Sequence, residues 1–251
     1  MPISNQVSIF VGGVQKSGTR SVSQYFRQHP NLTVHKKNEG HFFDRNENFI
    51  DNIPLAAALN DYHNNFTINS DTRALCDITP DYIFRRAAVQ RVFNYNPSAT
   101  WVIFLRNPID RAYSAWNMEV NRNTEKLSFE DALLSELKGN TKDRLHDRFQ
   151  YLERSRYYPQ ILNLWKYFPR SQCHICSAES VWRQPQVTLN KILKSLNVPV
   201  NINHEYEHIH KGTYKGNFTE QTRELLINQL HYELTELPDI LGWNKNPWTT
   251  I

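Results

Sequence analysis

Short apolar runs alternate along this chain with segments that repeat apolar side chains at helical spacing. The runs that predict strands are Val7–Val11, Leu32–Val34, Leu75–Asp77, Trp101–Leu105 and His174–Ser177. The helical patterns between and after them are Ser21–Gln28, Asp81–Asn94, Ile109–Glu119, Phe129–Lys138, Tyr158–Phe168 and Val187–Leu196. Short buried strands that alternate with helices predict an α/β fold, in which helices cover both faces of a central parallel sheet.

Two helix starts carry capping residues. Ser128 precedes an acidic first turn, and Thr219 precedes a last helix that we expect to run through Tyr232. The sequence has no internal repeat, low-complexity tract or obvious linker. We therefore expect residues 1–251 to form a single domain.

The first predicted strand leads into a glycine-rich turn and then into a helix N-terminus. Backbone N–H groups and the positive end of the helix dipole converge there, which makes an anion site. In a Walker A loop the lysine follows the last glycine and precedes the hydroxyl that holds magnesium. Here the lysine, Lys16, comes before Gly18, and Gly18 is followed directly by Thr19. The loop is predicted to hold a phosphate-like group without that metal-binding hydroxyl. The alternative is an ordinary glycine turn.

A second candidate anion site follows the predicted strand Trp101–Leu105. Arg106 stands at the C-terminal end of this strand, and Ser114 lies on the helix that follows Pro108. A planar guanidinium and a hydroxyl suit a phosphate dianion, although a surface ion pair and a solvent-facing serine would give the same pattern. Ligands of parallel sheets bind beyond the C-terminal strand ends. Two anion sites there predict a ligand with two separated anionic groups.

Composition and charge narrow the class of protein. The chain is 39% hydrophobic and 12% aromatic, which predicts a folded globule, and its net charge is +4. The basic residues do not run together, so we expect a small anionic ligand and no nucleic-acid partner. Apolar stretches of membrane-spanning length and a signal-peptide core are missing. We therefore expect a cytoplasmic protein without a membrane partner; the sequence predicts no oligomeric state.

Two further patterns suggest metal or redox chemistry. Cys173 and Cys176 form a C-x-x-C, but residues three apart on a strand point to opposite faces, so we interpret them as structural thiols. Three histidines stand close together after Pro199, where the sequence predicts a loop rather than a zinc-binding helix: His204, His208 and His210. We expect no metal site.

Taken together, these motifs resemble the sulfotransferases that use 3′-phosphoadenylyl sulfate (PAPS). The loop Gly13–Ser21 resembles their 5′-phosphosulfate loop, and Arg106 with Ser114 resembles their 3′-phosphate site. The closer likeness is to the heparan-sulfate-type branch, whose Glu-x-His-Phe-Phe run is similar to the segment Glu39–Asp44. Further matches, in family order, are Thr79–Tyr82, Ser155–Tyr157 and Lys211–Gly212. The resemblance implies a P-loop-like three-layer fold with a central parallel sheet.

The resemblance also implies roles for the candidate residues. Lys16 would neutralise charge on the leaving oxygen. Glu39 would be the catalytic base, and His41 the alternative base or its orienting partner. Desolvation of the carboxylate beside Phe42 and Phe43 would raise the pKa of Glu39, which suits a general base. From the residues alone, a solvated acid and a core histidine are the simpler interpretation.

Other residues are implied to bind the nucleotide or the acceptor, without a metal. Those implied to bind PAPS and its product adenosine 3′,5′-bisphosphate (PAP) are Gln15, Lys16, Ser17, Gly18, Thr19, Arg20, Ser21, Arg106, Ser114, Lys211, Gly212, Thr213 and Tyr214. Contacts to the acceptor or the nucleotide are implied for Asp77, Arg156 and Tyr157.

One departure from the family concerns the acceptor. Heparan-type enzymes often carry Glu-Lys before Thr-Pro, where this chain has Asp77 and Ile78. The missing lysine would help to hold a sulfated sugar. Together with the lack of a predicted membrane anchor, this favours a stand-alone bacterial or cyanobacterial-like tailoring enzyme of secondary metabolism. We expect sulfation of a hydroxyl or amine on a small polar metabolite or sugar. The alternative function is a P-loop nucleotide or small-molecule kinase, against which the lysine position argues.

Overall fold

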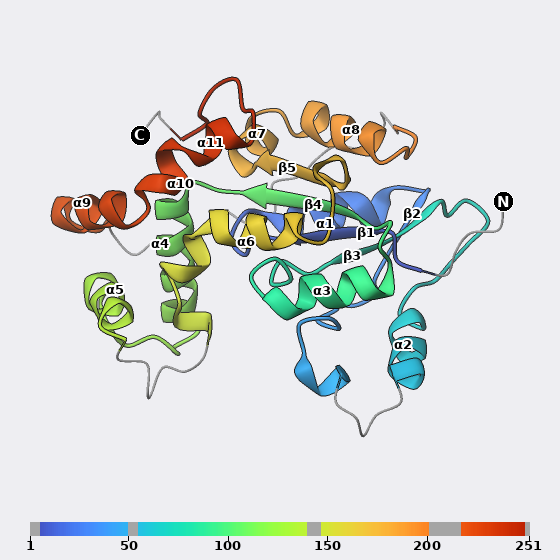
Figure 1. Ribbon diagram of the computed structural model, residues 1–251, viewed down its shortest axis with the longest axis horizontal. Helices are drawn as coiled ribbons and strands as arrows, with labels where there is room; N and C mark the ends of the chain where they lie inside the picture. The colour runs from blue at the N-terminus through green and yellow to red at the C-terminus, as the bar shows by residue number, and fades with distance from the viewer. Residues whose placement is uncertain (1–5, 50–54, 140–146, 201–216, 249–251) are drawn as a thin grey trace. The chain divides into compact units, whose positions relative to one another are not determined.

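The computed structural model describes residues 6–49, 55–139, 147–200 and 217–248 (Figure 1). Each of the predicted strands is present, with bounds within two residues of those expected. The strands are β1 (Ile9–Gly13), β2 (Leu32–Val34), β3 (Ala74–Ile78), β4 (Thr100–Leu105) and β5 (Cys173–Ser177). They form one parallel sheet in the order β2-β3-β1-β4-β5, which confirms the predicted architecture.

The chain divides into two compact units, each made of two segments. Unit 1 comprises residues 1–105 and 160–210, and unit 2 comprises residues 106–159 and 211–251. Since both units draw on segments that are distant in sequence, neither is a continuous stretch of chain. The single domain expected over residues 1–251 stays a prediction.

Unit 1 contains the sheet and the helices that cover it. Its helices are α1 (Thr19–Gln28), α2 (Leu55–His63), α3 (Arg86–Tyr95), α7 (Ala178–Arg183) and α8 (Pro185–Ser195), with 3₁₀ turns η1 (Asn46–Phe49) and η4 (Arg170–Gln172). Helix α6 (Tyr157–Trp165) begins in unit 2 and ends in unit 1.

Side chains of the strands alternate between the two faces of the sheet. Ile9 and Val11 of β1 lie in an apolar core with buried residues of α1, α7 and α8. On the opposite face Phe10 stacks on Trp101 of β4, with ring centroids 5.8 Å apart. Trp101 in turn contacts Phe168, 5.6 Å away. Both faces of the sheet are therefore packed, as a buried parallel sheet requires.

Unit 2 is helical in its described residues. Its elements are α4 (Pro108–Asn121), α5 (Phe129–Leu137), η2 (Asp147–Phe149), η3 (Glu153–Ser155), α9 (Glu220–Gln229), α10 (His231–Thr235) and α11 (Leu237–Ile240). Buried side chains of α4, α5 and α9 share its core. The predicted caps are confirmed, because Ser128 Oγ accepts from Asp131 N at 3.1 Å and Thr219 Oγ1 accepts from Thr222 N at 3.2 Å.

Three helix predictions are wrong at their ends. The helix expected over Tyr158–Phe168 ends at Trp165. The helix expected from Asp81 begins only at Arg86, because the preceding segment is held along β1: Ile83 N donates to Gly12 O at 2.9 Å. The helix expected to run through Tyr232 ends at Gln229. Leu230, buried in the core of unit 2, leaves helical backbone angles with φ −118° and ψ 18°.

Candidate active site

The loop from Gly13 to α1 closes on itself through backbone and side-chain hydrogen bonds. Val14 N donates to Phe104 O of β4 at 3.0 Å. Ser17 donates twice to Val14 O, from its N–H at 3.2 Å and from its hydroxyl at 2.6 Å. The N–H and hydroxyl of Ser17 thus shape the loop, which leaves the first turn of α1 as the source of the N–H groups that an anion would meet.

The glycines of the loop serve different purposes. A Cβ on Gly12 would lie 2.3 Å from the Trp101 ring, and one on Gly13 would lie 2.5 Å from Ile83 Cγ2. Glycine is required at these positions because neighbouring side chains pack against the backbone. Gly18, by contrast, has the left-handed φ of 84° and precedes α1 as its N-cap.

Most candidate residues of the loop are at least partly buried. Lys16 has a left-handed φ of 78°, which is costly for a residue with a side chain. Gln15, Lys16 and Gly18 are half-buried. Ser17, Thr19 and Ser21 are buried, whereas Arg20 is exposed.

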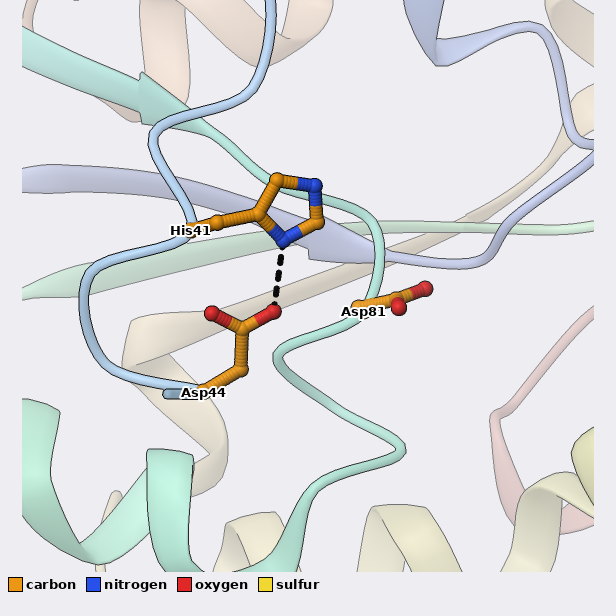
Figure 2. A group of neighbouring side chains, drawn as sticks. All are labelled: His41, Asp44 and Asp81. Carbon is orange, nitrogen blue, oxygen red and sulfur yellow. Dashed lines mark hydrogen bonds and ion pairs between the residues drawn. The ribbon is translucent and has the colours of Figure 1, made fainter. Parts of the chain in front are cut away.

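His41 joins two carboxylates in the segment that follows β2. Its Nδ1 lies 2.7 Å from Asp44 Oδ2 (Figure 2). Its Nε2 lies 2.9 Å from Glu39 Oε2. The hydrogen bond to Asp44, and then that to Glu39, raise the pKa of His41 to about 10 despite its partial burial. His41 is therefore an imidazolium at neutral pH, with both ring nitrogens donating. Asp44 is a site residue that the sequence analysis missed; its position three residues after His41 is the only local signal.

The desolvation of Glu39 expected beside Phe42 and Phe43 is wrong, and the alternative of a solvated acid holds. Its side chain is 48% exposed, although Phe42 and Phe43 are buried. The two phenylalanines point into an aromatic cluster, where the Phe43 ring lies 5.7 Å from Phe10 and the Phe42 ring 4.6 Å from Tyr62. The two phenylalanines anchor the segment in the core, while the carboxylate of Glu39 stays accessible to solvent.

Asp81 lies beside His41 and Asp44 (Figure 2). One possible metal-ligand atom of each of these three residues lies within 4.8 Å of the other two. These residue types can bind a cation. However, an imidazolium offers no lone pair, so His41 would first have to lose a proton that two carboxylates hold. The hydrogen bonds favour a charged His–carboxylate cluster over a metal centre.

Asp77, at the C-terminal end of β3, is fully buried. Its Oδ2 accepts from the hydroxyls of Tyr62 and Tyr82 at 2.7 and 2.8 Å, and its Oδ1 accepts from Thr79 at 2.7 Å. These hydroxyl partners hold Asp77 inside unit 1, which favours an internal role over the acceptor or nucleotide contact implied by the resemblance.

In unit 2, Arg106 follows β4 directly and is half-buried. Its carbonyl accepts from the Tyr157 hydroxyl at 2.9 Å. Asn107 caps α4 by accepting from Ile109 N at 2.9 Å, and Ser114 lies on α4 with 7% exposure. Pro108 is the first residue of α4, one residue before the predicted start at Ile109.

Arg156 and Tyr157 differ in exposure. Arg156 reaches Gln229 Oε1 of α9 at 3.2 Å and Glu153 at 3.3 Å. Tyr157 is fully buried. A residue that the sequence analysis missed, Arg111, is also fully buried and donates from Nε to Ser155 Oγ at 2.6 Å. Burial lowers the pKa of Arg111 to about 10.

Some candidates lie outside the described residues. These are Lys211, Gly212, Thr213 and Tyr214, together with the histidines His204, His208 and His210. Among described residues, Cys173 and Cys176 are free thiols on β5. Burial raises their pKa values to about 12 and about 11, which makes them poor nucleophiles at neutral pH. In the described ranges, no helix has the length and apolar character needed to cross a bilayer.

Comparison with known proteins gives one family. The Sulfotransferase domain family model matches residues 6–236. Heparan sulfate glucosamine 3-O-sulfotransferase 5 of Mus musculus is 26% identical over 194 residues, which cover 76% of this chain and 53% of that protein. Heparan sulfate glucosamine 3-O-sulfotransferase 6 of Homo sapiens is 26% identical over 203 residues, which cover 80% and 55%. The chain spans about half the length of these curated relatives.

Solved structures show the same fold. A sulfotransferase from Alicyclobacillus acidocaldarius aligns with a TM-score of 0.80 and 23% identity, over 97% of this chain and 99% of that one. Mouse sulfotransferase SULT7A1, complexed with PAP, aligns with a TM-score of 0.57 and 14% identity, over 95% and 88%. These likenesses confirm the P-loop-like three-layer fold predicted from the sequence.

Proposed function

The chain belongs to the sulfotransferase family, and we propose that it transfers a sulfuryl group from PAPS to a hydroxyl or amine of a small polar metabolite or sugar. PAP is the second product. The acceptor atom attacks the sulfur in line with the departing phosphate oxygen, the S–O bond to that phosphate breaks, and the acceptor proton passes to Glu39. Lys16 stabilises the charge on the departing oxygen.

The observation that carries this proposal is the position of His41 between Glu39 and Asp44. A histidine with a pKa of about 10 carries its proton at neutral pH and cannot act as the base. It can fix the orientation of the Glu39 carboxylate by donating to Oε2. The half-exposed Glu39 is then available to an acceptor hydroxyl, which supports it as the base and His41 as its orienting partner.

The loop before α1 supports a role in holding the 5′ end of the donor. Lys16 stands in a left-handed conformation that glycine would adopt with less strain. The presence of a lysine in this conformation supports a role for its side chain in binding or in the reaction. Arg106 and Ser114, at and after the end of β4, are proposed to bind the 3′-phosphate.

Calorimetric titration with PAP, ADP and AMP in metal-free buffer tests the donor. We expect PAP to bind and the other two nucleotides to bind weakly, because they lack the 3′-phosphate. ADP binding as tight as that of PAP, especially with magnesium restored, would overturn the proposal in favour of a nucleotide kinase.

The reaction itself is tested with radiolabelled PAPS and a panel of hydroxyl- and amine-bearing acceptors. Transfer of label by the wild-type chain, and its loss in Lys16→Ala and Glu39→Gln with PAP binding retained in Glu39→Gln, is the expected result. Undiminished transfer by Glu39→Gln would remove Glu39 from the role of base.

A further inference from the structure

We propose that Asp77, acting through Thr79 and Tyr82, is a positioning residue for the Glu39–His41 segment. It touches no substrate in this scheme. Its catalytic consequence rests on the proposed function, whereas its effect on the geometry of the segment does not.

The proposal begins with the direction of the hydrogen bonds around Asp77. An ionised carboxylate is an acceptor only. The hydroxyls of Thr79 and Tyr82 therefore donate their hydrogens to Asp77, at 2.7 and 2.8 Å. Each hydroxyl oxygen then has only lone pairs to offer to other groups. Asp77 thereby converts two hydroxyls into fixed acceptors.

These acceptors receive successive backbone N–H groups of the candidate site. Thr79 Oγ1 accepts from Gly40 N at 3.0 Å and from His41 N at 3.3 Å. The Tyr82 hydroxyl accepts from Phe42 N at 3.1 Å. The backbone of the segment that carries Glu39 and His41 is thus hydrogen-bonded to two hydroxyls, and both hydroxyls are hydrogen-bonded to the buried Asp77.

Close packing and backbone strain in the segment agree with this arrangement. A Cβ on Gly40 would lie 2.9 Å from Asp77 Oδ2, so the backbone passes the carboxylate where only glycine fits. His41 has a left-handed φ of 49°, a conformation that persists only where surrounding contacts impose it. Since the direction of the His41 side chain depends on this backbone conformation, the Asp77 network aligns the imidazole with Glu39 and Asp44.

Four variants separate positioning from general stability. Thr79→Val removes the relay hydroxyl with little change of shape, and Thr79→Ser keeps a hydroxyl. Thr33→Val is the matched control, because it removes a buried hydroxyl of β2 whose contacts are to Thr72 Oγ1 at 2.9 Å and Thr67 O at 3.5 Å, outside the Glu39–His41 segment. Asp77→Asn tests the carboxylate directly, since an amide nitrogen cannot accept from a hydroxyl.

The first measurement is the pKa of His41 by nuclear magnetic resonance, which needs no substrate. In Thr79→Val and Asp77→Asn we expect it to fall from about 10 towards the ordinary value of about 6.5, because the imidazole loses its alignment with the carboxylates. Thr79→Ser and Thr33→Val should keep the wild-type value. An unchanged His41 pKa in folded Thr79→Val overturns the proposal, even if Asp77→Asn fails to fold.

The second measurement is transfer kinetics. Loss of alignment of a general base should lower kcat of Thr79→Val by about 10- to 100-fold, with KM for PAPS and the affinity for PAP unchanged, and Thr79→Ser should recover most of the rate. An equal loss in Thr33→Val would show a stability effect and contradict positioning. If the wild-type chain transfers no sulfuryl group, the proposed function fails, while the His41 measurement still decides the role of Asp77.

Discussion

Asp77 in unit 1 and Arg111 in unit 2 are both fully buried charged side chains, but the protein compensates them to different extents. Both oxygens of Asp77 accept hydrogen bonds, all from hydroxyls. Arg111 donates from Nε to Ser155 and from Nη2 to the Tyr151 carbonyl. Its Nη1 has no hydrogen-bond partner among the described residues.

The difference indicates what each charge does. A buried charge costs free energy unless its hydrogen bonds are made. The complete set around Asp77 directs two hydroxyls towards the backbone of the Glu39–His41 segment. Arg111 instead ties structural segments together, since Ser155 Oγ also lies 3.0 Å from the carbonyl of Pro108 at the start of α4. We infer that the first charge chiefly serves the chemistry and the second chiefly serves the fold.

The largest expected effect is a loss of turnover when Glu39, in unit 1, is substituted. Glu39→Gln keeps the shape of the side chain but removes the proposed base, so kcat should fall by about 10²- to 10⁴-fold. The free energy of unfolding should stay close to that of the wild type, because the Glu39 side chain is 48% exposed. Glu47→Gln, an exposed acid on η1, is the matched control. Both quantities are read from steady-state kinetics and urea denaturation; a stability loss without a rate loss would contradict the comparison.

The opposite balance is expected for Arg111. Lysine keeps the charge but lacks the planar fork that reaches both Ser155 and Tyr151. Arg111→Lys should lower the free energy of unfolding by about 1–3 kcal/mol, because Ser155 and the Tyr151 carbonyl lose a charged hydrogen-bond donor. Arg122→Lys, on the 59% exposed arginine that follows α4, should change it little. Chemical denaturation measures both. An Arg111→Lys protein that is fully stable but loses turnover would reverse the roles assigned to the two charges.

A smaller and more selective effect is expected for Arg106. If Arg106 binds the 3′-phosphate as proposed, removing this charged hydrogen-bond partner should weaken PAP binding by about 10- to 100-fold. Ligands without a 3′-phosphate, such as AMP, should be affected much less by Arg106→Ala. Calorimetry with Arg122→Ala as the control measures this. Equal weakening for PAP and AMP would place the contact of Arg106 elsewhere on the nucleotide.

The sequence predicts the sheet well because each of its strands is a short, mainly apolar run. It misses α2, whose only buried residue is Tyr62, because such a helix shows no apolar stripe. The start of α3 is wrong for a related reason: the preceding segment bonds to β1, a contact between distant parts of the chain.

In the candidate site too, residues within local motifs are predicted from the sequence, whereas contacts between distant residues are not. Glu39, His41 and Lys16 are found through motifs, since local residue order carries them. Tyr62 and Asp77 meet only after folding, and no spacing in the sequence records their 2.7 Å hydrogen bond. The predicted burial of Glu39 is wrong because proximity in sequence to Phe42 and Phe43 says nothing about which face each side chain takes.

The effect that isolates His41 from the rest of unit 1 is a pH dependence of the free energy of unfolding. The pKa of His41 is raised to about 10 in the folded chain and is about 6.5 when unfolded. Folding therefore takes up a proton between these values, so its contribution to stability is complete below about pH 6.5 and is lost as pH rises towards 10. Urea midpoints should fall over this interval more steeply in the wild type than in His41→Gln, which has no titrating ring. Parallel curves for the two proteins would contradict the imidazolium and, with it, the orienting role that separates His41 from the base.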